Sequence, residues 1–245
     1  MRQFAHVPGN WPTLVYIPVE RSEQLRRWVT AVVDCANAPP HAAPPAAGPA
    51  PAAAPGPAWR AVADSDSGVG AGHISLSRSF PLRYPQIALF TETLADHAER
   101  YSAAGPSATF GMRLGRLKLF TNEDRTRSFL SLCPEPADNA RLERLIREVV
   151  DPACEAAEAP TFYRPAEPHL SVAWALGDRT GGALTAEALQ RSVEERLRAG
   201  GAEAGAAAAD AGGSGETAAG GSAAVVVAVR GFESRSGNRV STFPL

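Results

Sequence analysis

The sequence has few cysteines and no long hydrophobic run. Its 245 residues include 3 cysteines, at positions 35, 133 and 154. An odd number at such wide spacing gives neither a disulfide framework nor the close ligand spacing of a zinc site. No apolar stretch approaches the roughly 20 residues that cross a bilayer, and the amino terminus lacks the apolar stretch of a secretory signal. We therefore expect a reducing compartment, no membrane association, no metal and no other cofactor.

A strong net charge is also absent. The 24 Lys and Arg residues are balanced by 26 Asp and Glu residues, which leaves a net charge of −2. No overall positive field attracts nucleic acid, so any such contact must come from a local patch. Five basic residues near one expected hairpin are candidates to follow phosphates, although a solvated strand face carries the same kind of residue. They are Arg113, Arg116, Lys118, Arg125 and Arg127.

Two segments have low sequence complexity. Residues 36–58 hold 11 Ala and 8 Pro, and residues 199–224 hold 12 Ala and 8 Gly. Proline fixes φ and removes a backbone donor, so the first segment is expected to be extended or disordered. Interspersed glycine removes the helix preference of alanine, so the second is expected to be a flexible loop. We expect one domain over residues 1–245, with inserts at about 36–70 and 199–224.

The rest of the sequence predicts strands and helices in alternation. Strands are expected over residues 13–19, 72–80, 110–120, 127–132, 168–176, 225–231 and 240–243. Helices are expected over residues 20–34, 85–101, 139–154 and 186–197, with a hairpin turn at 122–125. This order predicts an α+β fold of two pseudo-twofold-related lobes around a central cleft. Each lobe is expected to be an antiparallel sheet with helices on its outer face.

Two short segments are near copies of each other. One reads His-Ile-Ser-Leu over residues 73–76, and the other reads His-Leu-Ser-Val over residues 169–172. In a strand, side chains alternate between faces, so each imidazole faces the same way as the hydroxyl two residues later. The alternation also places Ser77 on the histidine face and Trp174 on the opposite face. One copy alone indicates only an amphipathic strand, whereas two copies favour a shared site.

The residues of this pair suit the chemistry of a phosphodiester. The pKa of a free imidazole, about 6.5, lets one histidine act as a base and the other as an acid near neutral pH. We assign His169 as the base and His73 as the acid, and the reverse assignment stays open. Ser75 and Ser171 are expected to donate hydrogen bonds to the non-bridging phosphate oxygens. Two histidines with serine neighbours do not form a zinc site.

Longer blocks extend the likeness over nearly the whole chain. They occupy residues 2–11, 15–18, 73–79, 82–83, 119–129, 161–178, 236–239 and 243–245. The strongest block reads Thr-Phe-Tyr-Arg-Pro-Ala-Glu-Pro-His-Leu-Ser-Val-Ala-Trp-Ala-Leu-Gly-Asp over residues 161–178. In these blocks the chain resembles the U6 small nuclear RNA phosphodiesterase family of the two-histidine phosphoesterase superfamily.

The resemblance implies a nuclear 3′-to-5′ exoribonuclease that acts on the single-stranded 3′ end of U6 RNA. Such an enzyme trims a uridine-rich end that sometimes carries adenosine. It leaves a 2′,3′-cyclic phosphate, which some members open to a monophosphate. The nucleophile is the ribose 2′-OH on the 5′ side of the scissile bond. We expect the enzyme to act as a monomer.

The resemblance also suggests substrate-binding residues outside the two motifs. In the family a tyrosine at the position of Tyr163 stacks on the terminal base, and a core or surface aromatic without that role is the alternative interpretation. Glu123 stands where members often carry glutamine, and a carboxylate cannot donate as an amide does. Glu167 and Pro168 are expected to shape the wall of the cleft.

Two other functions remain open at this point. A two-histidine cyclic or 2′-5′ phosphodiesterase that acts on small nucleotides would carry the same motif pair. Tyr163 and the flanking blocks argue against it. A non-catalytic RNA-binding protein is a candidate of another class. The two intact histidines argue against that candidate, because binding alone needs no matched acid and base.

Overall fold

Ten strands form the centre of the protein, which was analysed as a computed structural model. The structure describes residues 7–38, 58–62, 72–104, 109–182, 185–210 and 224–245, with backbone alone for 201–210. Residues 1–6, which include the start of the first family block, and most of the two expected inserts (39–57, 63–71 and 211–223) lie outside the described residues. The strands are β1 (Asn10–Pro18), β2 (Arg60–Ala61), β3 (His73–Ser75), β4 (Phe80–Arg83), β5 (Phe110–Thr121), β6 (Arg127–Pro134), β7 (Leu170–Leu176), β8 (Val225–Val229), β9 (Gly231–Ser236) and β10 (Arg239–Pro244).

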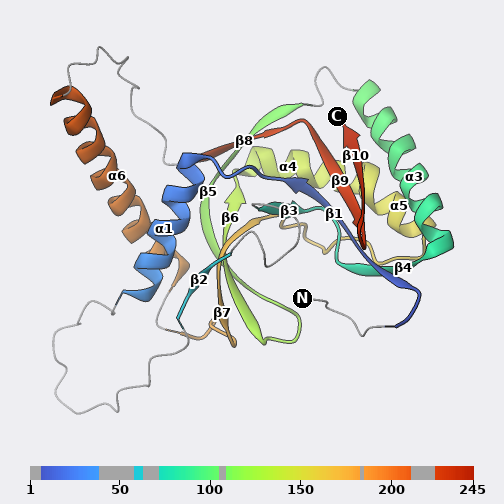
Figure 1. Ribbon diagram of the computed structural model, residues 1–245, viewed down its shortest axis with the longest axis horizontal. Helices are drawn as coiled ribbons and strands as arrows, with labels where there is room; N and C mark the ends of the chain where they lie inside the picture. Colours follow the sequence, from blue (N-terminus) through green and yellow to red (C-terminus); the bar gives the residue numbers. More distant parts are fainter. Residues whose placement is uncertain (1–6, 39–57, 63–71, 105–108, 183–184, 211–223) are drawn as a thin grey trace.

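The strands join in a single curled sheet. Their order is β10-β9-β1-β3-β7-β6-β5-β8, with β4 also beside β1 and β2 beside β7 (Figure 1). The pairs β1–β3, β3–β7 and β6–β7 are antiparallel, as are the others of the sheet. The α+β class and the antiparallel pairing are therefore as the sequence predicts.

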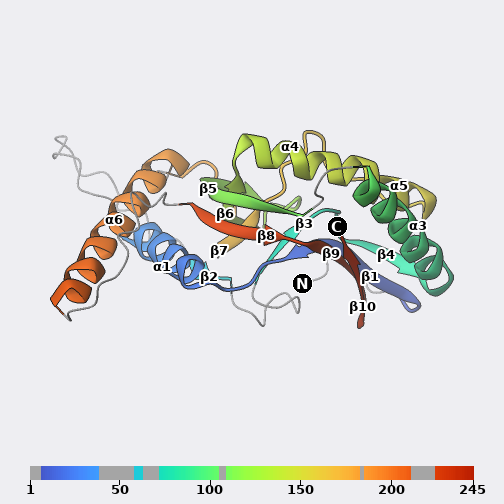
Figure 2. The same cartoon turned by 90° about the horizontal axis from the view of Figure 1, so that it is seen from above.

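The helices gather at two ends of this sheet. They are α1 (Glu23–Asn37), α3 (Tyr84–Ala103), α4 (Pro136–Leu145), a π-helical segment η1 (Ile146–Val150), α5 (Asp151–Ala156) and α6 (Ala186–Asp210). At one end α1 packs beside α6, and at the other α3 packs beside η1 and α5 (Figures 1 and 2). α1 is amphipathic: Leu25, Trp28 and Val32 are buried, and the Ser22 hydroxyl caps the helix by accepting a hydrogen bond from the Leu25 amide at 3.2 Å.

The expectation of two lobes with a sheet each is not confirmed. β3 and β7 connect the two halves of the sheet, and the pair Ile74–Leu170 is the registered contact between them. Both of these side chains are buried. Pairing these two strands satisfies backbone groups that two separate sheets would leave at open edges.

The expected strand over residues 72–80 is wrong in its second half. β3 ends at Ser75, and the chain bends before β4 begins. Ser77 produces the bend, because its Oγ accepts a hydrogen bond from the Val15 amide at 2.8 Å and donates to the Arg78 carbonyl at 2.9 Å. Ser77 is therefore a buried structural hydroxyl and does not share the face of His73.

The expected loop from residue 199 is wrong in its first part, because α6 continues to Asp210. The helix is anchored near its start by Gln190, whose side chain accepts from the Leu117 amide at 2.6 Å and donates to the Gly115 carbonyl at 2.9 Å. Once begun, it continues because alanine, the best helix former, is common enough to offset the glycines.

The strand β9 has no counterpart in the sequence prediction. Its alternate residues Phe232, Ser234 and Ser236 are buried, and two of these three are polar. Hydrophobic alternation therefore misses it. A turn joins β9 to β10, and Gly237 adopts φ +60° there.

Candidate active site

The pairing of β3 with β7 brings the two histidine segments together. Ile74 and Leu170 lie opposite each other and point into the core. Because faces alternate along each strand, the flanking residues point to the other face. Four of them, His73, Ser75, His169 and Ser171, line one pocket of about 60 Å³, together with Val62 and Gly72. The antiparallel register sets each imidazole at the level of the other segment's serine.

The ring of His169 is held from two sides. Its Nδ1 lies 2.8 Å from the carbonyl oxygen of Glu167, and its ring stacks on Phe120 with centroids 3.9 Å apart. A carbonyl only accepts, so Nδ1 carries the proton and donates it, which leaves Nε2 available for proton exchange. Burial lowers the pKa of His169, while the Glu167 carbonyl and carboxylate oppose that shift.

The ring of His73 is positioned by packing. It meets the edge of Tyr16 with centroids 5.7 Å apart and an interplanar angle of 70°. The Tyr16 hydroxyl donates to Glu233 Oε2 at 2.5 Å, which fixes the tyrosine in turn. Burial lowers the pKa of His73 to about 4, and the nearby charge of His169 adds to the effect. Since the charge on one imidazole disfavours a charge on the other, the pair resists holding two protons at once.

The two serines differ in their partners. The Oγ atoms of Ser171 and Ser131 lie 3.2 Å apart, and these two residues are opposite each other on β7 and β6. For Ser75 no side-chain hydrogen bond is found among the residues that the structure describes. Sequence reasoning missed Ser131, whose only signal is its place in the strand that follows the hairpin turn.

Tyr163 lies in a cluster with Arg78 and Glu123. Its ring is 43% exposed, and its hydroxyl donates to Glu123 Oε1 at 3.0 Å. The Arg78 guanidinium lies 4.5 Å from the centre of the ring and forms an ion pair with Glu123. Glu123 thus holds Tyr163 and Arg78 in place, and hydrogen bonds from both lower its pKa. Arg78 lies in the family block at residues 73–79, but no pattern in the sequence assigns it a role.

The segment before β7 is fixed by two further contacts. Asp151, which is buried at the start of α5, accepts from the Phe162 amide at 2.9 Å and forms an ion pair with Arg164 at 2.5 Å. Glu167 orients His169 through its backbone carbonyl, while its carboxylate pairs with Lys118. Pro168 is buried beside them. Neither Glu167 nor Pro168 is among the residues that line the pocket, so Glu167 acts on the site through its contact with His169.

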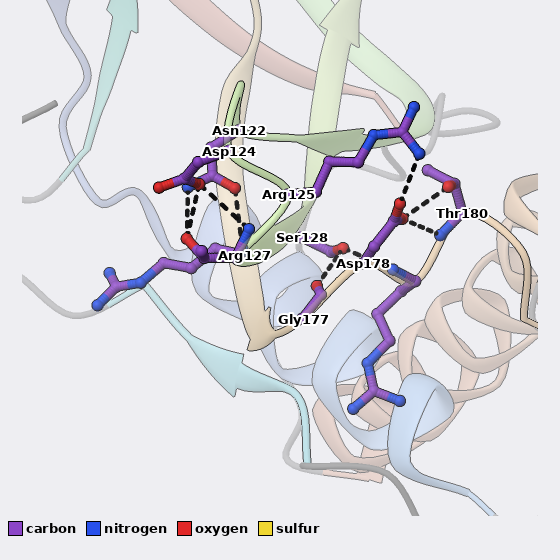
Figure 3. A network of polar contacts seen from close by, with 10 residues as sticks. Asn122, Asp124, Arg125, Arg127, Ser128, Gly177, Asp178 and Thr180 are labelled. Carbon is purple, nitrogen blue, oxygen red and sulfur yellow. Dashed lines mark hydrogen bonds and ion pairs between the residues drawn. The ribbon is translucent and has the colours of Figure 1, made fainter.

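A polar network fixes the hairpin turn that carries Glu123 (Figure 3). Asn122 Oδ1 accepts from the Arg127 amide at 2.8 Å, and Ser128 Oγ donates to the Gly177 carbonyl at 2.8 Å. Arg125 forms an ion pair with Asp178 at 3.1 Å. The turn is thereby tied to the end of β7.

The five basic residues near this hairpin do not form one patch. Lys118 is paired with Glu167, and Arg125 is paired with Asp178. Arg113 and Arg116 are exposed on β5 and do not line the pocket of the histidines. Arg127 lies over the Trp174 ring.

Trp174 lies on the opposite face from the one expected. A β-bulge interrupts the β6–β7 register, so Ser131 pairs with Ser171 while Leu130 pairs with Ala173. The extra residue, Val172, reverses the alternation beyond it. Trp174 therefore shares the face of Ser171, and a bulge of this kind leaves no clear mark in the sequence.

In the described part of the chain, no group of three or more His, Cys, Asp or Glu side chains is placed to hold a metal ion. Within the same residues, no helix is long and apolar enough to cross a membrane.

Known proteins resemble this chain in sequence and in structure. The profile of HVSL, a family described as "Uncharacterised conserved protein", matches residues 1–244. U6 snRNA phosphodiesterase 1 of Drosophila melanogaster is 32% identical over 182 residues, which cover 73% of this chain and 58% of that protein. The protein of the same name from Mus musculus is 30% identical over 180 residues, 73% of this chain and 55% of that protein. The chain thus spans a little over half the length of these relatives.

The fold has a solved counterpart. The structure of Kluyveromyces marxianus Usb1 superposes with a TM-score of 0.54 at 12% sequence identity, and the match covers 96% of this chain and 98% of that one. At this identity the likeness concerns the fold.

Proposed function

Because this chain belongs to the HVSL family, and its curated relatives are named U6 snRNA phosphodiesterase 1, we propose that it trims the 3′ end of U6 small nuclear RNA. The proposed activity is that of a 3′-to-5′ exoribonuclease that removes uridines and adenosines by metal-independent acid/base catalysis. One observation carries the proposal. Two His-x-Ser strands from distant parts of the chain line a single pocket.

The proposed reaction is a transesterification at the last phosphodiester. The 2′-OH of the penultimate ribose attacks phosphorus, and its proton passes to Nε2 of His169. The bond from phosphorus to the departing 5′ oxygen breaks, and His73 donates the proton that this oxygen takes up. The products are a nucleoside and an RNA that ends in a 2′,3′-cyclic phosphate. Hydrolysis of that ring to a 3′ phosphate exchanges the two roles.

The surroundings of His169 favour it as the base. The hydrogen bond from Nδ1–H to the Glu167 carbonyl fixes the tautomer that leaves Nε2 unprotonated. The same carbonyl stabilises the imidazolium that forms when Nε2 accepts a proton. His73 has no such acceptor among the described residues, and the phosphate of a bound substrate supplies the negative charge that favours its protonated form.

Serine and tyrosine side chains complete the proposed substrate contacts. Ser75 and Ser171 donate hydrogen bonds to the non-bridging oxygens, where negative charge grows in the transition state. The exposed ring of Tyr163 stacks on the base of the departing nucleotide, and Arg78 and Glu123 hold that ring in place.

Product analysis tests the proposal. Purified protein is incubated with 5′-labelled oligouridine in EDTA, and the product ends are identified by mass spectrometry. We expect stepwise shortening with cyclic phosphate or 3′ phosphate ends, and no cleavage when the penultimate 2′-OH is replaced by hydrogen. Turnover of small cyclic or 2′-5′-linked nucleotides alone would indicate the other two-histidine enzyme class. Binding without cleavage would indicate a non-catalytic RNA-binding protein.

We extend the proposal to location and assembly. Kinship with proteins named for U6 snRNA supports a nuclear location, which fluorescence microscopy of the tagged protein tests. We also propose a monomeric enzyme, because the proposed reaction uses no residue of a second copy. Light scattering measures the mass in solution, and a dimer mass would contradict this.

A further inference from the structure

Three aromatic side chains form a row across the sheet beside the pocket. Phe120 on β5 lies opposite Phe129 on β6, and Phe129 lies opposite Trp174 on β7. Arg60 on β2 lies opposite Trp174 in turn. Residues directly opposite each other on neighbouring strands point to the same face. We call Phe120, Phe129 and Trp174 the aromatic row; Arg60 stands at its end.

The aromatic row begins at the wall of the pocket. Phe120 stacks on His169 with centroids 3.9 Å apart, and the β6–β7 bulge turns Trp174 to the face of Ser171. Neighbouring strands are about 4.8 Å apart, so the row and Arg60 together extend about 14 Å. Stacked nucleotides rise about 3.4 Å each, so this length accommodates more than one nucleotide.

Two guanidinium groups accompany the row. Those of Arg127 and Arg60 lie 4.8 Å and 5.8 Å from the centre of the Trp174 ring. Neither forms an ion pair with any residue of the described ranges, in contrast to Lys118, which is paired with Glu167. Figure 3 shows the Arg127 side chain extending away from the carboxylates of the hairpin turn. Neither charge is therefore neutralised by a salt bridge within the described ranges, although the charge of Arg127 helps to lower the pKa of Asp124.

Aromatic rings interleaved with unpaired arginines suit single-stranded nucleic acid. Every base has a face that stacks on an aromatic ring or a guanidinium plane, and each phosphate is attracted to a guanidinium. The aromatic row and its two arginines lie beside the proposed phosphodiester site, which an RNA strand would enter and a protein partner would not. The face therefore fits an RNA strand better than a protein surface.

We propose that the aromatic row, with Arg60 and Arg127, binds the RNA on the 5′ side of the scissile phosphate. Bases stack along the row and phosphates contact the two arginines. This inference rests on the proposed function and deepens it, because it makes the enzyme prefer a long single strand to a dinucleotide. It also separates two binding regions: Tyr163 for the departing nucleotide and the row for the strand that stays.

A binding experiment tests the row independently of cleavage. Fluorescence anisotropy measures the affinity for a 2′-O-methyl oligouridine, which lacks the attacking hydroxyl, over a series of salt concentrations. We expect the double variant Arg60→Gln/Arg127→Gln to bind about tenfold more weakly, and the slope of log K against log salt to fall by about 1.4, about 0.7 per lost contact. Unchanged affinity and slope would overturn the proposal, as would failure of the wild-type protein to bind this RNA.

The chain offers a matched control. The Arg239 guanidinium lies 5.2 Å from the centre of the Tyr84 ring, a contact of the same kind that is not part of the row. The variants Arg239→Gln and Tyr84→Leu should leave affinity and salt slope within about twofold of the wild-type values. Equal weakening by Arg239→Gln and Arg127→Gln would mean that general charge, rather than the row, attracts RNA, and would overturn the proposal.

A cleavage experiment tests the predicted length preference. The ratio of kcat/KM for a long oligouridine to kcat/KM for the dinucleotide UpU should fall about tenfold in the arginine double variant and in Trp174→Leu. A ratio equal to that of the wild-type protein would overturn the proposal. If the wild-type protein cleaves neither RNA, the proposed function fails and the binding experiment alone decides. Circular dichroism checks Trp174→Leu, and the two surface arginines decide if that variant does not fold.

Discussion

The two histidine segments are near copies in sequence, yet the protein holds their rings by different means. The ring of His169 donates a hydrogen bond to a backbone carbonyl and stacks on Phe120. The ring of His73 rests on the edge of Tyr16 and is fixed by packing. A hydrogen bond selects a tautomer and stabilises a charged imidazole, whereas packing alone fixes position and favours the neutral form. Equal motifs therefore support unequal acid and base roles.

The strands that carry the two segments also differ. β7 has seven residues and pairs with β2, β3 and β6, whereas β3 has three residues and pairs with β1 and β7. The His169 side of the pocket thus stands on the more extensively paired strand. The His73 side depends on a short strand that is bent away at Ser77. Four experiments test whether these differences matter.

Removing either imidazole should have the largest effect. His73→Ala and His169→Ala should each lower kcat/KM on oligouridine by about 10²–10⁴-fold, because each removes one half of the acid/base pair. The matched control is His97→Ala, which removes a half-buried imidazole on α3 that does not line the pocket and should leave the rate unchanged. If one of the two site variants kept near wild-type activity, the paired mechanism would be wrong.

The two serines should differ by a smaller factor. Ser75→Ala should lower kcat about 10–100-fold, because among the described residues Ser75 has no hydroxyl partner that could replace the lost donor. Ser171→Ala should cost less, since the Ser131 hydroxyl, 3.2 Å from that of Ser171, remains nearby. Single-turnover rates on oligouridine measure both. The double variant Ser131→Ala/Ser171→Ala removes both hydroxyls, so its kcat should fall about as far as that of Ser75→Ala. If its kcat fell no further than that of Ser171→Ala alone, this account would be wrong.

Acid should reveal the different surroundings of the two rings. Folding lowers the pKa of His73 to about 4. Below about pH 6.5 the unfolded chain binds a proton at this residue, whereas the folded protein does not bind it until the pH approaches 4. Stability is therefore lost as pH falls through this window, by about 1–2 kcal/mol between pH 7.5 and pH 5. Urea unfolding at both pH values measures the loss.

The variant His73→Gln should reduce that acid loss by about the same 1–2 kcal/mol. His169→Gln should reduce it less, because the Glu167 carbonyl offsets part of the burial effect on His169. If His169→Gln reduced the acid-induced loss of stability more than His73→Gln does, folding would disfavour the charged form of His169 more strongly than that of His73.

The smallest expected effects come from the rings that support the imidazoles. Phe120→Leu removes the stacking on His169 and should lower kcat on UpU about two- to tenfold, the range that corresponds to an aromatic pair worth about 0.5–1.5 kcal/mol. Tyr16→Phe keeps the ring against His73 and loses only the hydrogen bond to Glu233, so it should cost about twofold or less. A larger loss for Tyr16→Phe than for Phe120→Leu would mean that His73 is the more sensitive ring.

Much of the fold could be predicted from the sequence, for identifiable reasons. Hydrophobic periodicity locates α1 and the β5–β6 hairpin within a few residues, because Leu25, Trp28 and Val32 recur at helical spacing and the turn residues 122–125 separate two apolar runs. β9 is missed because its buried face is largely polar. The length of α6 is missed because local composition gives a balance between alanine and glycine that the sequence alone does not decide.

The candidate site was predicted in part. His73, Ser75, His169 and Ser171 line one pocket, while Ser131, Arg78 and the supporting rings were not assigned. These unassigned residues reach the site through strand pairing and loop packing between distant parts of the chain. The position of Trp174 was predicted wrongly, since a single extra residue in β7 reverses the faces beyond it.

The sequence by itself determined that each imidazole shares a face with the hydroxyl two residues later, because the period of a strand is a local property of the backbone. Only the tertiary structure decided that β3 lies against β7, that Ile74 meets Leu170, and that a bulge turns Trp174 toward the pocket. Those outcomes depend on the pairing of strands far apart in the chain, and that pairing is selected by the packing of the whole core.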